Sequence, residues 1–275
     1  MNQLLRLPPG RVGSTTEQRA SAELGSYSVL GMRVDAAQIP GVIRRMEEWI
    51  ASRCSPSYIA VADMHSLMNA RHSAGFREVL RRANLTVPDG FPLVWLGRRK
   101  GFALPRRVYG PELMASFCDA TSARGYRHFF YGGAPGVAEE LASRFVRRYP
   151  GLQIAGTQTP PFRPLTPEED DAEVSMINAS CADVLWVGLG APKQEWWMFE
   201  HQSRLNVPVL VGVGAAFDFH TGRVAQAPPW MREHGFEWLF RLSREPRRLW
   251  RRYLIYGPEF VALVVLESLR LRKFI

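Results

Sequence analysis

The chain has 275 residues, 46% of them hydrophobic and 22% charged, which is an ordinary globular balance with enough apolar material for a large core. Its three cysteines, Cys54, Cys118 and Cys181, lie far apart without a Cys-x-x-Cys spacing, which disfavours a disulfide framework or a zinc site and favours a reducing compartment. The net charge of +9 is uneven, because residues 241–275 carry nine Lys or Arg against three Glu, and this excess indicates an anionic partner.

The first 25 residues are predicted to form a polar, flexible leader, because they lack an apolar core of signal-peptide length. Nowhere does the chain approach the ~20 consecutive apolar residues that cross a bilayer. The protein is therefore expected to stay in the cytoplasm.

From Ser26 onward, short β-type runs alternate with amphipathic helical patterns. Several strand candidates are continuous apolar runs, as expected for a parallel sheet that helices cover on both faces. The alternation predicts an α/β, Rossmann-like, doubly wound and mostly parallel fold for residues 26–221. The predicted strands are 27–34, 57–62, 84–88, 126–131, 152–157, 182–187 and 207–213, and the predicted helices are 36–53, 64–82, 110–124, 135–149, 167–179 and 191–203.

Two glycine-rich turns follow later strands and open helices, Gly132-Gly133 and Gly188 with Gly190. Such turns let the backbone approach a ligand and expose N–H groups to an anion, which favours a nucleotide diphosphate. The neighbouring Lys193 and Gln194 strengthen this interpretation, although glycine in a βα turn often has a purely structural role. Neither turn is a good G-x-G-x-x-G fingerprint and there is no P-loop, which argues against dehydrogenases and NTPases.

Asp89 follows a predicted buried strand and precedes Gly90, so its carboxylate should project into the crevice beyond the strand ends, where such sheets bind ligands. Partial burial would raise its pKa to a value useful for proton abstraction. In a glycosyl transfer with inversion, one such carboxylate suffices to take the proton of the acceptor hydroxyl. The alternative is an ordinary Asp-Gly turn.

The acidic run Glu168-Glu169-Asp170-Asp171 follows Thr166-Pro167 at a predicted helix N-terminus, where acidic residues favour the helix dipole. The six histidines have no metal-ligand spacing. We therefore expect no metal and no cofactor. The charge of a leaving diphosphate would then be met by helix N-termini and arginines.

Residues 222–275 are predicted to form a basic, amphipathic C-terminal appendage. The segment 247–254 would place cations on one helix side and aromatic and aliphatic residues on the other, with a start at Pro246. Gly257-Pro258 is predicted to break the chain before a second helix, 259–273, that is apolar nearly all round. Such a helix lies in a membrane interface or packs in a core, so an anionic membrane surface is a predicted partner. A terminal helix docked on the domain, with solvated arginines, is the alternative.

A set of motifs in a fixed order resembles the WecG/TagA/CpsF glycosyltransferases (glycosyltransferase family 26) from about Val29 to Tyr253. One such motif would be weak, but their order and spacing are specific. They are the stretches 87–90 (VPDG), 107–113 (RVYGPEL), 188–195 (GLGAPKQE), 212–218 (GVGAAFD), 227–231 (APPWM), 235–238 (GFEW) and 241–248, which contains REPRR.

The resemblance implies an inverting, metal-independent enzyme with a UDP-sugar as co-substrate and an undecaprenyl-diphosphate-linked sugar as acceptor. It implies work in cell-surface polysaccharide or teichoic-acid synthesis at the inner face of the membrane, and a possible homo-oligomer. By motif position, Asp89 matches the base and Arg107 and Gln194 match active-site polar residues. Asp218 falls in the nucleotide-side loop, and the appendage arginines matched to the donor diphosphate are Arg241, Arg248 and Arg251.

This chain departs from the family pattern at Asp63, where Val61-Ala62-Asp63 replaces a frequent Thr-x-Asn, and at His65, where an acidic residue is frequent. Both positions border the expected sugar pocket, so the donor sugar stays open, with glucose and uronic acids among the options. Two other functions remain as alternatives. One is a nucleotide-dependent oxidoreductase on the same fold. The other is a nucleic-acid-binding protein, which the interleaving of basic residues with a long apolar helix disfavours.

Overall fold

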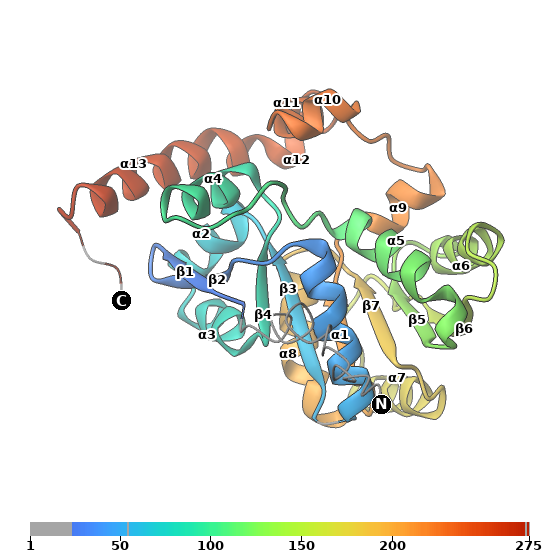
Figure 1. The fold of residues 1–275 in the computed structure, drawn as a ribbon. Helices are drawn as coiled ribbons and strands as arrows, with labels where there is room; N and C mark the ends of the chain where they lie inside the picture. Colours follow the sequence, from blue (N-terminus) through green and yellow to red (C-terminus); the bar gives the residue numbers. More distant parts are fainter. Residues whose placement is uncertain (1–23, 54, 273, 275) are drawn as a thin grey trace, which may run out of the picture.

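The computed structural model describes residues 24–53, 55–272 and 274, so the predicted leader lies almost entirely outside the described residues. At the centre is a six-stranded sheet in the order β4-β3-β8-β7-β5-β6, in which every neighbouring pair is parallel (Figure 1). The strands are β3 (Ser57–Ala62), β4 (Leu85–Pro88), β5 (Arg127–Gly132), β6 (Gln153–Gln158), β7 (Val184–Gly188) and β8 (Val209–Gly212).

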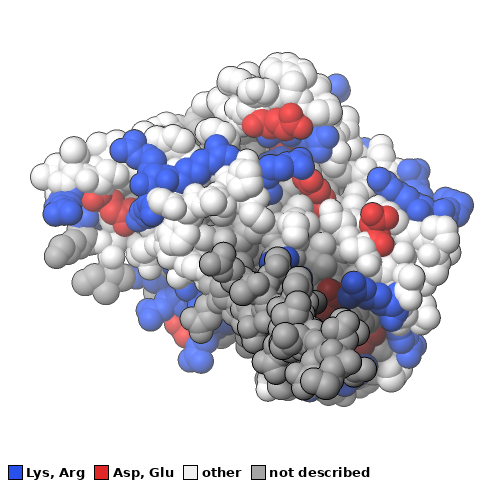
Figure 2. Space-filling model, in the orientation of Figure 1, with Lys and Arg blue, Asp and Glu red and all other residues white. Residues whose placement is uncertain are grey.

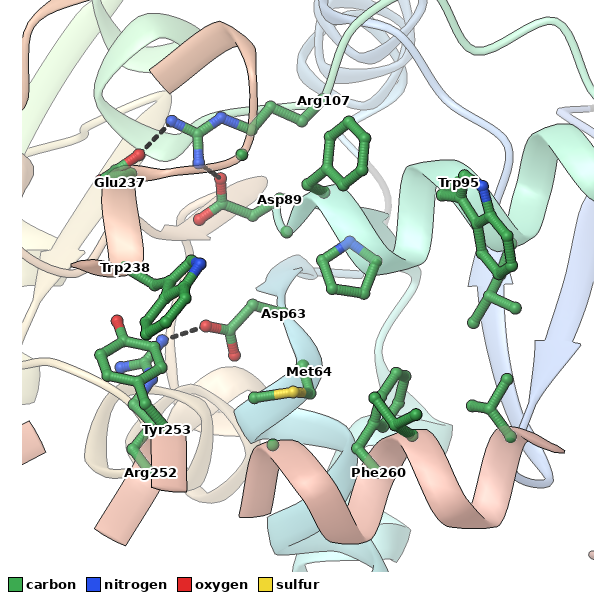
Figure 3. Close-up of a pocket in the computed structure, with 18 of the residues that line it drawn as sticks. Asp63, Met64, Asp89, Trp95, Arg107, Glu237, Trp238, Arg252, Tyr253 and Phe260 are labelled. Carbon is green, nitrogen blue, oxygen red and sulfur yellow. Dashed lines mark hydrogen bonds and ion pairs between the residues drawn. The ribbon is translucent and has the colours of Figure 1, made fainter. Parts of the chain in front are cut away.

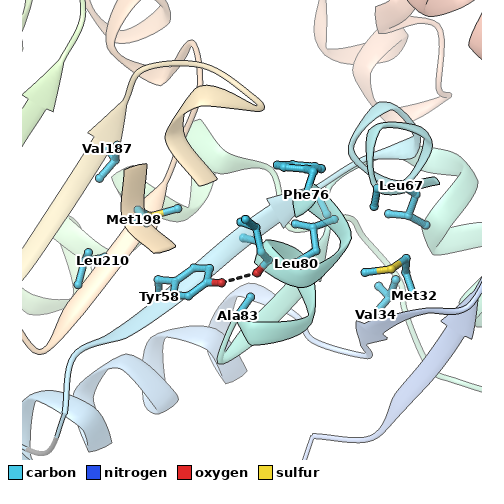
Figure 4. Close-up of a cluster of buried hydrophobic side chains, with 14 of the residues drawn as sticks. Met32, Val34, Tyr58, Leu67, Phe76, Leu80, Ala83, Val187, Met198 and Leu210 are labelled. Atoms are coloured by element: carbon cyan, nitrogen blue, oxygen red, sulfur yellow. Dashed lines mark hydrogen bonds between the residues drawn. The ribbon is translucent and has the colours of Figure 1, made fainter. Parts of the chain in front are cut away.

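The central strands β7 and β8 are almost continuously apolar and buried, which requires helices on both faces of the sheet. One buried cluster joins the sheet to α1, α5, α6 and α9. A second cluster, part of which Figure 4 shows, joins it to α3, α7 and α8. The doubly wound α/β prediction is confirmed. These helices are α1 (Ile39–Ser52), α3 (Ala74–Arg82), α5 (Gly110–Thr121), α6 (Val137–Arg148), α7 (Pro167–Ala179), α8 (Lys193–His201) and α9 (Ala216–Thr221), with single 3-10 turns at Ser122–Arg124 and Gln202–Arg204.

The prediction of one strand over 27–34 is wrong. The chain forms an antiparallel hairpin instead, β1 (Ser26–Val29) and β2 (Met32–Asp35), outside the main sheet. Its two-residue turn places both Leu30 and Gly31 at positive φ, 51° and 79°. Two-residue hairpin turns favour this backbone, but leucine rarely adopts it, so the sequence carried no turn signal there.

The predicted helix over 64–82 is two helices, α2 (Met64–His72) and α3, because Ser73 interrupts the pattern. The Ser73 hydroxyl accepts the backbone N–H of Phe76 at 3.2 Å and so caps a new helix. A further helix, α4 (Phe91–Arg99), was not predicted. The internal Gly97 weakens the helical pattern in the sequence. Glycine is needed at this position because a Cβ there would collide with the side chain of Leu104.

The C-terminal residues form α10 (Pro229–Glu233), α11 (Glu237–Arg244), α12 (Pro246–Trp250), a π-helical turn (Arg251–Ile255) and α13 (Tyr256–Ser268). They run along one edge of the molecule, over α2 and α4 (Figure 1). The predicted break at Gly257-Pro258 and the helix bounds 259–273 are wrong. Proline lies in the first turn of α13, where its missing N–H is tolerated, and the wider π turn precedes it.

Helix α13 packs Phe260, Leu263 and Val264 into the core and leaves Val261 and Val265 exposed. It therefore combines core packing with an open apolar side. Among the described residues, no helix is both long enough and apolar enough to span a membrane. The proposed division at residues 221 and 222 remains a prediction.

Candidate active site

Two carboxylates meet at the carboxyl ends of neighbouring strands. Asp63 follows β3 and Asp89 follows β4, and the strands are paired in register with Ala62 opposite Pro88. The Asp89 N–H donates to the carbonyl of Ala62 at 2.8 Å. Gly90 permits this approach, since a Cβ there would lie 3.3 Å from the Cβ of Asp63. The predicted placement of Asp89 beyond a buried strand is thus observed.

Arg107 lies between two acidic side chains (Figure 3). One of its terminal nitrogens is 3.6 Å from Oδ1 of Asp89, and the other donates to Glu237 of α11. The guanidinium also lies 4.2 Å from the ring centre of Tyr109. These contacts fix the cation beside Asp89, and Glu237 brings the C-terminal elements into the same cluster.

The pKa of Asp89 is raised to about 7, chiefly because burial disfavours the charged carboxylate. Arg107 opposes this rise, whereas the negative charges of Glu237 and Asp63 add to it. No described residue hydrogen-bonds to Oδ1 of Asp89. That oxygen is shielded from solvent and faces Arg107, whereas the side chain as a whole is 26% exposed and lines the cavity. Asp89 is therefore a carboxyl poised near neutral pH at the cavity wall.

Asp63 has the opposite character. Its carboxylate caps α2 by accepting the N–H of Ser66 at 3.0 Å, and it pairs with Arg252 of the π-helical turn. Burial alone would raise the pKa of Asp63, but Arg252 and the cap outweigh burial and lower it. Neighbouring carboxyls with pKa values pushed apart are typical of acid–base sites, with Asp63 the permanently ionised member.

His65 faces the C-terminal helix. Its ring stacks on Tyr256 with 5.6 Å between ring centres, and its Nδ1 has no hydrogen-bond partner among the described residues. Burial and the nearby Arg252 lower the pKa of His65. The ring of His72 also stacks on Tyr256, with 5.5 Å between ring centres, and Nε2 of His72 lies 3.2 Å from a carboxylate oxygen of Glu259. These contacts dock α13 on α2.

A cavity of about 670 Å³ opens at these residues (Figure 3). Its polar end contains Asp63, Asp89 and Arg107 from the sheet side and residues of the C-terminal elements on the other side. Its far end is apolar and lies between α4 and α13. The C-terminal residues lining the polar end are Arg232, Glu237, Trp238, Arg241, Arg252 and Tyr253.

The predicted glycines form a second group at the ends of β5 and β7. The N–H of Gly133 donates to the carbonyl of Gly188 at 3.1 Å. A Cβ on Gly132 would lie 2.7 Å from the carbonyl atoms of Gly188, so glycine is required there by backbone packing. Gly190, at φ 77°, has open space around it. The structural role of Gly132 is therefore certain, and its role toward a ligand stays a prediction.

Gln194 supports this second group from inside. It is buried, accepts the N–H of Gly214 at 2.9 Å and donates to Glu195 at 2.8 Å. Lys193 is exposed at the start of α8. Asp218, on α9, is half-buried, and burial raises its pKa while Arg223 and Arg248 lower it. Gln194 thus shapes the loop after β8.

The three predicted appendage arginines separate in space. Arg241 lines the cavity. Arg248 pairs with Glu245 at 2.5 Å and lies on the side of Asp218, and Arg251 stacks on Trp250 at 5.4 Å. Neither lines the cavity that contains Asp89, whereas their neighbour Arg252 does.

Sequence reasoning missed Arg252 and Glu237 as site residues. Glu237 lay within a family motif, 235–238, and its position there was the available signal. No such signal existed for Arg252, because the sequence of a basic run does not show which of its arginines face the cavity until the rotation of the helix is known. Among the described residues, no group of three or more His, Cys, Asp or Glu side chains is placed to hold a metal ion. The run 168–171 instead starts α7, with a capping box between Thr166 and Glu169.

Comparison with known proteins gives a consistent assignment. The model of the glycosyl transferase WecG/TagA/CpsF family matches residues 27–274. A Bacillus spizizenii protein is 30% identical over 230 residues, covering 83% of this chain and 86% of its own, and a Staphylococcus aureus (strain MW2) protein is 24% identical over 260 residues, covering 94% and 99%. Both are named N-acetylglucosaminyldiphosphoundecaprenol N-acetyl-beta-D-mannosaminyltransferase.

Proposed function

The chain belongs to the WecG/TagA/CpsF glycosyl transferase family, and from this premise we propose that it moves a sugar from a UDP-sugar to a sugar linked to a polyprenyl diphosphate. It is a glycosyltransferase rather than an oxidoreductase or a nucleic-acid-binding protein. The names of the relatives, which specify a diphosphoundecaprenol-linked acceptor, support the lipid-linked substrate. The product would belong to a cell-surface polysaccharide or teichoic-acid-type polymer.

The observation that carries the mechanism is Asp89, a partly buried carboxyl that lines the strand-end cavity and has a pKa of about 7. We assign it as the general base. The acceptor hydroxyl oxygen attacks the anomeric carbon as Asp89 takes the hydroxyl proton. The bond from that carbon to the diphosphate oxygen breaks, and UDP leaves with the electron pair. The configuration at the anomeric carbon is inverted.

The departing diphosphate needs positive charge, and we propose that protein groups supply it without a metal. Arg241 and Arg252 lie on the cavity that contains Asp89. Arg107, which pairs with Asp89, is assigned to orient that carboxylate. The glycine turns at 132–133 and 188–190 are assigned to the nucleotide, and so are Asp218 and Arg248, which lie close to each other. Closure of the C-terminal elements over the donor would join the two groups.

We further propose that the enzyme works at the inner face of the membrane, bound to anionic lipid. Helix α13 exposes Val261 and Val265, and the chain beyond it exposes Leu269 and carries Arg270 and Arg272. Lys and Arg side chains also form a band across the face of the molecule on which α4 lies (Figure 2). A handful of such cations near an anionic surface contributes roughly 1 kcal/mol each.

The test is UDP release from a panel of UDP-sugars, with N-acetylglucosamine-diphosphate-lipid as acceptor. The panel includes UDP-N-acetylmannosamine, UDP-glucose and a UDP-uronic acid, because the departure from the family pattern at Asp63 leaves the identity of the donor sugar unassigned. Asp89→Asn should fold but lose transfer by about 10²–10⁴-fold, the usual worth of a general base. Asp119→Asn, an exposed aspartate on α5, is the matched control and should retain full activity. An unimpaired Asp89→Asn enzyme would exclude this base.

A further inference from the structure

The apolar half of the cavity is a groove between two helices. Helix α4 contributes Phe91 and Trp95, which are 44% and 43% exposed. Helix α13 contributes Val261, which is 60% exposed, and Leu269, directly after the helix, is 63% exposed. Large apolar side chains left open along a continuous groove usually mark a binding surface. The groove has no role in the transfer chemistry described above.

The groove runs from the catalytic carboxylate toward the outside. Met64 and Phe260 lie between the polar end and the apolar end (Figure 3). The lining residues of α13 extend from Gly257 to Ser268, a span of about 17 Å at the helical rise, and Leu269 follows directly. A ligand with its reacting head at Asp89 therefore has an extended apolar path leading away from it.

The cations of the lining are placed unevenly. Arg107, Arg232, Arg241 and Arg252 lie at the polar end. Arg107 and Arg252 are paired there with the carboxylates of Asp89, Glu237 and Asp63. Arg232 and Arg241 have no ion pair among the described residues, so they supply the uncompensated positive charge. Along the apolar part, the only charged lining residue among those described is Arg99, whose guanidinium lies over the Trp95 ring at 4.8 Å. Positive charge at the inner end and apolar surface beyond it match a molecule with an anionic group followed by a hydrocarbon chain.

We propose that this groove binds the first isoprene units of the lipid acceptor, next to its diphosphate. The inference rests on the proposed function and extends it: the enzyme would recognise the prenyl chain itself, and not only the sugar and the diphosphate. The groove is continuous with the site of Asp89, so head and tail are bound by one cavity. The tail contributes affinity that a tail-free acceptor lacks.

The experiment compares two soluble acceptors without any membrane. Both carry N-acetylglucosamine diphosphate, one as a geranyl ester and the other as a methyl ester. Because one buried methylene is worth roughly fourfold in binding, kcat/KM of the wild-type enzyme should be at least about tenfold higher for the geranyl ester. A series of longer prenyl esters should reach a plateau once the groove is filled.

Two variants remove the groove surface, Trp95→Ala and the double change Val261→Ser with Val265→Ser. All three side chains are exposed, so the fold should tolerate their loss. In each variant the geranyl-to-methyl ratio of kcat/KM should fall to within about threefold of unity, through KM. The matched control is Leu254→Ser with Ile255→Ser, since these residues are 59% and 46% exposed and do not line the cavity.

The control should keep the wild-type ratio. If both groove variants keep the wild-type geranyl-to-methyl ratio of kcat/KM and lose activity only on phosphatidylglycerol vesicles, the surface contacts the membrane and the groove proposal is wrong. Wild-type transfer to both esters with equal kcat/KM would also refute the groove, while leaving the proposed function intact. Absence of transfer to any acceptor, with every donor, would instead refute the proposed function.

Discussion

Glu237→Gln tests whether the charges around Asp89 set its strength as a base. The wild-type pKa of about 7 predicts that kcat/KM rises with pH through an acid limb near 7, because only the ionised carboxylate accepts a proton. Glu237 raises that pKa by its negative charge, and it also engages the far side of Arg107. Neutralising Glu237 removes the repulsion and leaves Arg107 to stabilise the Asp89 carboxylate. The acid limb should therefore move to lower pH.

The size of the shift follows from Coulomb's law. With the two carboxylates separated by a guanidinium, a distance on the order of 8 Å and an effective dielectric constant of about 20 give about 2 kcal/mol. Since one pKa unit corresponds to about 1.4 kcal/mol, we expect the limb to fall by about 1 to 1.5 units. A base of lower pKa is also weaker, so the plateau at high pH should decrease by a small factor.

The assay measures kcat/KM for UDP release from pH 5 to 9 in the wild type and in Glu237→Gln. Glu78→Gln removes the same charge from the exposed side of helix α3, where Glu78 pairs with Arg82, and serves as the control. Its limb should stay where the wild-type limb is. A Glu237→Gln limb that is unchanged or moves to higher pH refutes the electrostatic account of Asp89.

Three further predictions concern stability. The raised pKa of Asp89 means that the folded state holds its proton more tightly than the unfolded state, so stability is lost as pH rises from about 4 to about 7. A difference of about three pKa units corresponds to about 4 kcal/mol. Asp89→Asn should therefore melt on the order of 10 °C higher than wild type at pH 8 and show no gain at pH 4. Gly132→Ala should lower the free energy of urea unfolding by about 2 kcal/mol more than Gly136→Ala does. Both glycines have positive φ, but only a Cβ at residue 132 would collide with backbone atoms. Equal losses of stability would contradict this packing argument. Asp63→Asn keeps the helix cap but not the ion pair with Arg252, and Asp63→Ala loses both, so Ala should be less stable by about 1 kcal/mol; equal stability would mean that the cap contributes nothing.

Most of the sheet could be predicted because burial on both faces leaves a direct mark on the sequence. Strands such as Val184–Gly188 have no polar alternation to confuse them with surface strands. The predictions that were wrong concern elements whose bounds depend on a single local feature. The Leu30 turn adopts a conformation that leucine disfavours, and the break at Ser73 depends on one hydroxyl cap.

The site was partly predictable for a similar reason. Asp89 lies at a strand end, and parallel sheets bring such ends to one edge, so sequence position translates into spatial position. Arg252 and Glu237 reach the same cavity from elements far along the chain. Their placement depends on how α11 and the π-helical turn dock, and that docking depends on pairs such as His72 with Glu259 that no local pattern reveals.

The same docking determines whether Asp89 can act as a base. Burial is the largest cause of its raised pKa, and the C-terminal elements cover it with Trp238 and Tyr253 while adding the charge of Glu237. An open arrangement would expose Asp89 to water, and its pKa would return toward that of an ordinary aspartate, about 4, where proton abstraction is far weaker. The base strength of Asp89, the arginines proposed to face the diphosphate and the proposed acceptor groove therefore all depend on one interface. A lipid acceptor that fills the groove against α13 would stabilise the closed arrangement that makes Asp89 reactive.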